Sequence, residues 1–181
     1  MSFPRAAGIL LHPTSLPGPN GIGDLGREAH KFLDFLAAAG MKIWQVLPLG
    51  PTGYGDSPYQ CFSAFAGNPL LIHVPGAAPG AGEGEQGSGG SDEGGPVRDA
   101  SASQVDFERV IPRKKAMLKA ALDRFVPDDA YRQFVEQERA WLEDYALFMA
   151  LKDAHGGSSW TAWDPGAARR DPESLATWRA T

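Results

Sequence analysis

The sequence predicts an α/β fold built on parallel strands, and three observations lead to this prediction. Two short apolar runs, residues 8–12 and 43–47, have the composition of buried strands. Between them, residues 27–39 repeat apolar side chains at the spacing of one buried helical face. A helix between two strands gives a crossover long enough for a right-handed βαβ unit, in which the two strands are parallel.

Punctuating residues mark where each of these elements ends. The first strand leads into a Pro- and Gly-rich loop over residues 13–26. The helix stops before Gly40, which can take the left-handed conformation of a helix C-cap. The second strand stops at Pro48 and is almost entirely apolar, so we expect it to be covered on both faces. The predicted buried face of the helix comprises Ala29, Phe32, Leu33, Leu36 and Ala39.

Composition divides the chain into three segments. Residues 1–75 are apolar and punctuated by Gly and Pro, as expected for the first βαβ part of a sheet. Residues 76–101 are dominated by Gly, Ser, Ala and Glu. Because this segment has few apolar side chains to bury, it cannot offset its ordering entropy, and we predict a flexible loop. Residues 102–181 are predicted to form a separate helical part.

Two helices are predicted in the last segment, over about residues 113–125 and 129–155. Gly156 and Gly157 would end the longer one. A basic cluster at residues 113–115 lies at the predicted start of the shorter helix, and we interpret it as a solvated face. The predicted apolar face of the longer helix comprises Tyr131, Phe134, Trp141, Tyr145, Phe148 and Met149.

Charge and cysteine content exclude several classes of protein. The 181 residues carry a net charge of −5, so no basic field exists to neutralise the phosphates of a nucleic acid. The single cysteine, Cys61, cannot form a disulfide within the chain, which favours a reducing compartment. The sequence shows neither a signal peptide nor an apolar run of membrane-spanning length, so we predict a cytoplasmic protein that does not contact membranes.

One glycine motif resembles a dinucleotide-binding fingerprint but lacks its context. Residues 21–26 fit the pattern G-x-G-x-x-G, yet a Pro- and Gly-rich loop precedes them where a strand is required. The acidic residue that would hold a ribose is also absent from residues 41–50. We therefore interpret the motif as a loop entering a helix, with Asp24 near the positive end of the helix dipole, and predict no cofactor.

The loop within residues 50–69 carries the most informative chemistry. It follows the second predicted strand, and ligands of α/β sheets bind beyond the carboxyl ends of strands. Aromatic faces can stack on the C–H faces of sugars, while Asp, Ser and Gln can bind hydroxyls. A packed structural loop with half-buried tyrosines is an equally good interpretation from the chemistry alone. The candidate residues are Tyr54, Asp56, Ser57, Tyr59 and Gln60, with no Lys or Arg among them.

Histidines and the late tryptophans favour structural roles. Trp160 and Trp163 could stack on sugars, but core packing is the favoured interpretation. The four histidines are scattered without the spacing of metal ligands, so we predict no metal site. They are His12, His30, His73 and His155.

Several long phrases resemble the start of the 4-α-glucanotransferases, the amylomaltase or disproportionating-enzyme family. They are AGILLHPTSLPGPNGIGDLG at residues 7–26 and IWQVLPLGPTGYGDSPYQCFSAFAGNPLLI at residues 43–72. Two further phrases are VDFERVIPRKKAMLKAAL at residues 105–122 and WLEDYALFMALKDAHGGSSWTAW at residues 141–163. The chain departs from the family at residues 76–101, where its members carry a short apolar segment.

The resemblance implies a partial (β/α)8 TIM barrel with an inserted helical subdomain. It also implies transfer of α-1,4-glucan segments to glucose or maltodextrin acceptors with retention, a reaction that needs two carboxyl groups about 5–5.5 Å apart. In the family these carboxylates lie on later strands, so we expect an N-terminal fragment, inactive alone, with no catalytic residue before Thr181. The alternatives are an α-amylase-type hydrolase and a non-catalytic glucan-binding fragment.

The resemblance assigns substrate-binding roles within the GYGDSPYQ phrase at residues 53–60. Ser57 and Tyr59 would contact sugar near the cleaved bond, and Tyr54 would belong to a secondary glucan site on the surface. Asp56 would order the loop. The expected partner is an α-1,4-glucan or maltooligosaccharide.

Overall fold

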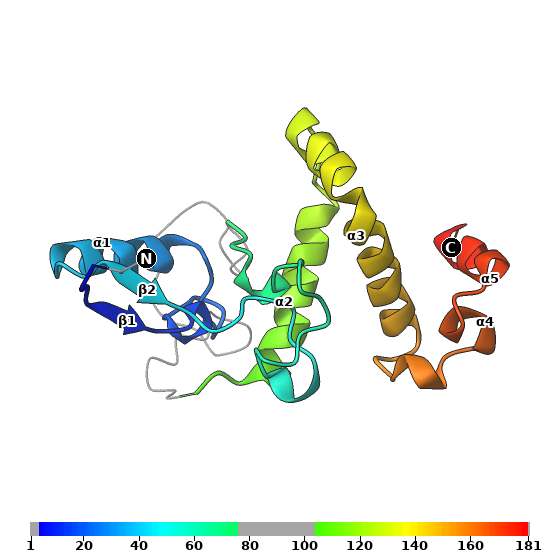
Figure 1. The fold of residues 1–181 in the computed structure, drawn as a ribbon, viewed down its shortest axis with the longest axis horizontal. Coiled ribbons are helices and arrows are strands. Elements are labelled where there is room, and N and C mark those ends of the chain that lie inside the picture. The colour runs from blue at the N-terminus through cyan, green and yellow to red at the C-terminus, as the bar shows by residue number, and fades with distance from the viewer. Residues whose placement is uncertain (1–3, 76–103, 181) are drawn as a thin grey trace, which may run out of the picture. The chain divides into compact units, whose positions relative to one another are not determined.

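The computed structural model describes residues 4–75 and 104–180, which form two compact units (Figure 1). The first unit ends at Phe125 and the second begins at Val126. The flexible loop predicted over residues 76–101 lies outside the described residues.

A βαβ arrangement forms the start of the first unit. Strands β1 (Gly8–Leu10) and β2 (Ile43–Gln45) pair in parallel and are joined through helix α1 (Arg27–Ala38). The register sets Ile9 beside Trp44. The predicted order, the parallel pairing and the extent of the helix are confirmed, while each strand is two residues shorter than predicted.

Only one face of the strand pair is covered among the described residues. On that face Trp44 packs edge-on against Phe32 of α1, with ring centroids 5.1 Å apart. On the other face Leu10 and Ile43 are 58% and 50% exposed. The prediction that the second strand is covered on both faces is therefore wrong for the part of the chain described. The physical reason is that parallel strands need a layer on each side, and here α1 supplies only one.

Helix α2 (Phe107–Leu122) completes the first unit and differs from its prediction. It begins earlier because Asp106 caps it, accepting a hydrogen bond from the Arg109 N–H at 3.2 Å. Pro112, just before the predicted start at residue 113, lies inside the helix, where proline removes one backbone hydrogen bond. Its apolar face joins a buried cluster of Ile22, Leu70 and Val110, against which Val105, Phe107 and Ile111 pack.

The basic cluster at residues 113–115 is not a solvated face throughout. Lys114 is only 1% exposed, and its ammonium lies 3.2 Å from a carboxylate oxygen of Asp24. The interpretation as a solvated face is therefore wrong for Lys114. It fails because Lys114 projects from the same side of α2 as the buried Val110 and Met117, at helical spacing.

The second unit is helical. It contains α3 (Asp129–Ala154), α4 (Pro165–Ala168) and α5 (Pro172–Ala180). Gly156 and Gly157 have φ angles of 63° and 78°, which confirms the predicted end of the long helix. A buried cluster of Leu151, Trp163, Ala167 and Leu175 forms the core, with Leu147, Phe148 and Trp178 packed against it.

The predicted aromatic face of α3 is covered toward its C-terminal end. Tyr131 and Phe134, near the start, are 44% and 48% exposed. Core packing is the right interpretation for Trp163, which is 7% exposed, and the wrong one for Trp160, which is 55% exposed. Trp160 opens the short helical turn Trp160–Ala162, and its ring stands at the edge of the core rather than in it.

The compact units do not follow the predicted segment boundary at residue 102. Because α2 packs on the loops before α1 and after β2, it belongs to the first unit. The inserted helical subdomain stays a prediction. None of the helices within residues 4–75 and 104–180 has the length and apolar character needed to cross a membrane.

Candidate functional site

The loop at residues 50–69 begins just past the carboxyl end of β2. Its outgoing and returning segments, the two legs of the loop, pair through an isolated antiparallel bridge between Thr52 and Cys61. The Gly53 N–H donates to the Gln60 carbonyl at 2.8 Å. These contacts close the legs onto each other, so the residues between them form a hairpin-like tip.

Backbone geometry shapes this tip. A single helical turn spans Tyr54–Asp56, with Gly55 and Asp56 in the left-handed region at φ angles of 65° and 53°. Left-handed backbone is costly for most residues, and aspartate tolerates it better than most. Beyond the turn, the Ser57 hydroxyl accepts a hydrogen bond from the Tyr59 N–H at 3.3 Å. The five candidate residues, Gln60 included, therefore lie together within residues 54–60 of this short tip.

Both tyrosines present their rings to solvent. Tyr54 is 88% exposed and Tyr59 is 72% exposed. The packed-loop interpretation requires tyrosines that are at least half-buried, so their exposure counts against it. Asp56 and Ser57, next to them along the chain, are partly buried. The tip thus combines exposed aromatic faces with neighbouring carboxylate and hydroxyl groups.

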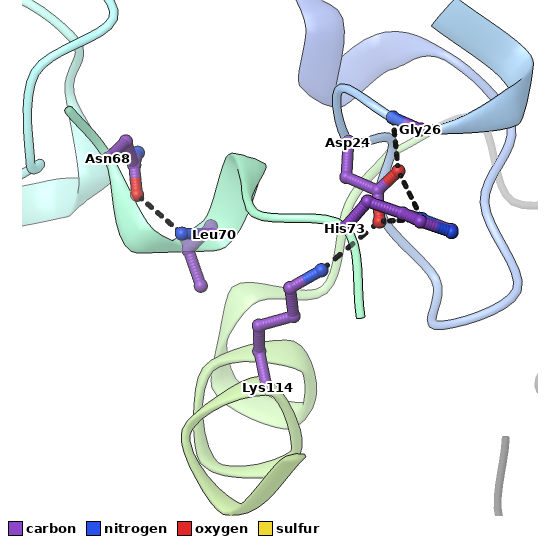
Figure 2. Close-up of polar contacts among 6 residues, drawn as sticks. All are labelled: Asp24, Gly26, Asn68, Leu70, His73 and Lys114. Atoms are coloured by element: carbon purple, nitrogen blue, oxygen red, sulfur yellow. Dashed lines mark hydrogen bonds and ion pairs between the residues drawn. The ribbon is translucent and has the colours of Figure 1, made fainter. Parts of the chain in front are cut away.

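The base of the loop is held firmly. Asn68 is 6% exposed, and its side-chain oxygen accepts from the Leu70 N–H at 2.9 Å (Figure 2). Its own N–H donates to the Leu49 carbonyl at 2.7 Å, which ties the end of the loop to its beginning. At Gly50 a Cβ atom would stand 2.8 Å from the sulfur of Cys61, so the close approach of the two legs requires glycine.

A buried polar cluster links α1, α2 and the segment after the loop (Figure 2). Asp24 accepts hydrogen bonds from the Gly26 N–H at 3.0 Å and from the Lys114 ammonium at 3.2 Å. His73 Nδ1 lies 3.3 Å from both carboxylate oxygens. Asp24 lies at the N-terminal end of α1, as predicted. Neither Lys114 nor His73 was predicted to join this cluster, because each lies far from Asp24 along the chain.

His12 lies at the same edge of the sheet as the loop, directly after β1. Its Nδ1 is 2.7 Å from the Thr14 hydroxyl oxygen. Burial lowers the pKa of His12, and the nearby Pro48 carbonyl opposes part of that shift. The other ring nitrogen, Nε2, is buried, and Nδ1 is already engaged with Thr14, so His12 supports this edge of the sheet from within the structure.

Within the described residues, no three His, Cys, Asp or Glu side chains gather in a way that could hold a metal ion. The exposed tyrosine rings of the loop can stack on a ligand, and the side chains of Asp56 and Ser57 can form hydrogen bonds.

Comparison with known proteins identifies the family. A family model described as 4-alpha-glucanotransferase matches residues 11–181. The chain belongs to the 4-alpha-glucanotransferase family. The resemblance read from the sequence is thereby confirmed.

Individual members of the 4-alpha-glucanotransferase family agree with this assignment. The chain is 52% identical to the 4-alpha-glucanotransferase of Thermus thermophilus, over 97% of this chain and 34% of the relative. It is 45% identical to the Synechocystis enzyme, over 96% of this chain and 34% of the relative. Among solved structures, it resembles an amylomaltase from Streptococcus agalactiae in complex with acarbose, with a TM-score of 0.75 and 36% identity. That match covers 97% of this chain and 35% of the other.

The chain thus spans about a third of the length of the 4-alpha-glucanotransferases that it matches. The roles of Tyr54, Asp56, Ser57 and Tyr59 in binding stay predictions.

Proposed function

We propose that this chain is the N-terminal part of a 4-alpha-glucanotransferase that moves α-1,4-glucan segments onto glucose or maltodextrin acceptors. The family match over residues 11–181 supports the proposal, as does the chain's span of about a third of its relatives. In this view β1, α1 and β2 open a (β/α)8 barrel, and later strands supply the nucleophile and the acid/base for a retaining reaction. A cytoplasmic location is part of the proposal.

The loop at residues 50–69 binds the glucan in this proposal. The observation that carries it is the exposure of Tyr54 and Tyr59 on a backbone-constrained tip beyond β2. Each ring offers an apolar face to a pyranose, and Ser57 and Asp56 offer hydroxyl and carboxylate partners. The loop positions substrate and performs no bond chemistry.

Product analysis tests the transferase. The full-length protein incubated with maltotriose should yield glucose together with maltodextrins longer than maltotriose. An α-amylase-type hydrolase would release glucose and maltose without longer products, and that outcome overturns the transferase proposal.

Substitution of Tyr59 tests the loop. In the full-length protein Tyr59→Ala should lower kcat/KM for maltodextrin by about two- to twelvefold, the equivalent of losing about 0.5–1.5 kcal/mol of aromatic contact. Because Tyr59 is exposed, thermal stability should barely change. Tyr131→Ala, which removes a tyrosine of helix α3 outside the loop, is the matched control and should leave kcat/KM unchanged. A large loss of stability with intact kcat/KM would instead support the packed-loop interpretation.

The second candidate is a glucan-binding module without activity. The predicted absence of catalytic carboxylates before Thr181 favours it. Titrating the 181-residue chain with maltodextrin would show binding without any change in glucan length if this candidate is right.

A further inference from the structure

We propose that the second unit carries a separate glucan-binding site, formed around Trp160 in a cavity between the end of α3 and the helices α4 and α5. The choice of an α-1,4-glucan as ligand rests on the proposed function. The site itself rests on the shape and chemistry of the cavity, which lies wholly within residues 126–181.

The cavity has the size and lining of a small-ligand site. Its volume is about 340 Å³, within the range of about 300–1,000 Å³ typical of such pockets. Its floor is apolar, formed in part by Phe148, Leu151 and Trp163 of the core cluster. The indole N–H of Trp163 already donates to the Ser158 carbonyl at 3.3 Å, so Trp163 supports the floor.

Trp160 supplies an aromatic surface at the side of this cavity. It is 55% exposed, although it lies close to a well-formed core. A large exposed indole beside a cavity is suited to stacking on the C–H face of a pyranose, because the ring combines a broad apolar face with a polar N–H.

The polar side of the cavity is a neutral ion pair. One guanidinium nitrogen of Arg170 lies 2.9 Å from each carboxylate oxygen of Asp144. The pair leaves further guanidinium donors and carboxylate acceptors for hydroxyl groups. Asp144 would repel an anionic ligand, and Arg170 would repel a cationic one. A neutral polyhydroxy ligand can use both.

The backbone at Arg170 supports a role beyond packing. Its φ angle is 58°, in the left-handed region that favours glycine at the end of a helix. A non-glycine residue costs about 1–2 kcal/mol there, and strained backbone of this kind concentrates at binding sites. The Arg170 N–H donates to the Ala167 carbonyl at 3.1 Å, which fixes the turn that directs the side chain to Asp144.

The test is fluorine NMR of the full-length protein labelled with 5-fluorotryptophan, with the Trp160 signal identified by its loss in Trp160→Phe. Adding maltoheptaose should shift the Trp160 signal, and cellotriose, with the other anomeric linkage, should shift it less. Trp160→Ala should weaken maltoheptaose binding at this site by about three- to tenfold, and Trp160→Phe should restore most of it. Arg170→Ala should weaken binding without removing the shift.

Activity on maltotriose, measured on the same samples, separates the two proposals. Turnover to longer products with an unmoved Trp160 signal would overturn this second site and leave the proposed function intact. Another part of the protein could cover the cavity, and the Trp160 signal would then be protected from a soluble paramagnetic agent. An unmoved and protected Trp160 signal would also overturn this second site and leave the proposed function intact. A Trp160 shift without turnover would support the site and overturn the transferase.

Discussion

Replacing Lys114 tests what holds the first unit together. The ammonium of Lys114 lies 3.2 Å from Asp24, and the two side chains are 1% and 9% exposed. Lys114→Met keeps the apolar stem but leaves the Asp24 charge buried without its ammonium. Removing one partner of a buried pair costs about 3–5 kcal/mol. We expect about 3 kcal/mol, the lower end, because the Gly26 N–H and His73 still face the carboxylate.

Hydrogen exchange across α2 during urea unfolding measures this loss locally. A denaturant slope of about 2 kcal/mol per molar urea would convert it into a midpoint lowered by roughly 1.5 M. Lys119→Met, at an exposed lysine of the same helix, is the matched control and should shift the midpoint by about a tenth of that amount.

The double variant Asp24→Asn with Lys114→Met separates charge from packing. Asparagine keeps an acceptor for the Gly26 N–H while removing the uncompensated charge, so most of the lost stability should return. The reasoning is refuted if Lys114→Met costs no more than Lys119→Met, or if the double variant is less stable than Lys114→Met.

Two further outcomes follow from the first unit. Gly23→Ala should lower the free energy of unfolding by about 3 kcal/mol, because its Cβ would lie 2.1 Å from the Pro13 carbonyl oxygen. Gly40→Ala has open space around its Cβ at a φ of 72°, so it should lower the free energy of unfolding by only about 1–2 kcal/mol, as a thermal unfolding measurement would show. Burial lowers the pKa of His12 below 6.5, so the unfolded chain binds that proton more readily, and stability should fall as the pH drops below about 6.5. His12→Gln should flatten this part of the dependence of Tm on pH, and an unchanged slope would contradict the assignment.

Local signals in the sequence were sufficient for most of the secondary structure. Apolar spacing located α1 within one residue of its observed end, because the buried Ala29 and Leu36 repeat at the helical period. Gly156 and Gly157 marked the end of α3 because a helix terminus needs left-handed backbone. These features depend on residues that are close along the chain.

Contacts between residues far apart along the chain could not be predicted from local sequence patterns. Lys114 and Asp24 are 90 residues apart, and nothing in the local pattern of either predicts the other. From the sequence alone, a buried lysine cannot be distinguished from an exposed one, because residue type does not determine burial. The same limit applies to the tyrosines of the tip, whose chemistry was evident from sequence but whose exposure was not.

The buried contacts of α2 also bear on the candidate sugar loop. The loop ends in the short turn Pro69–Leu71, and Leu70 belongs to the cluster that α2 covers. The Leu71 carbonyl accepts from the Leu25 N–H at 3.0 Å, next to Asp24. The base of the loop is therefore fixed by the core and by the Asp24–Lys114 pair, whereas the tip depends on its own backbone. A binding loop gains precision from such a rigid base, so variants that loosen α2 should weaken glucan binding without touching a sugar contact.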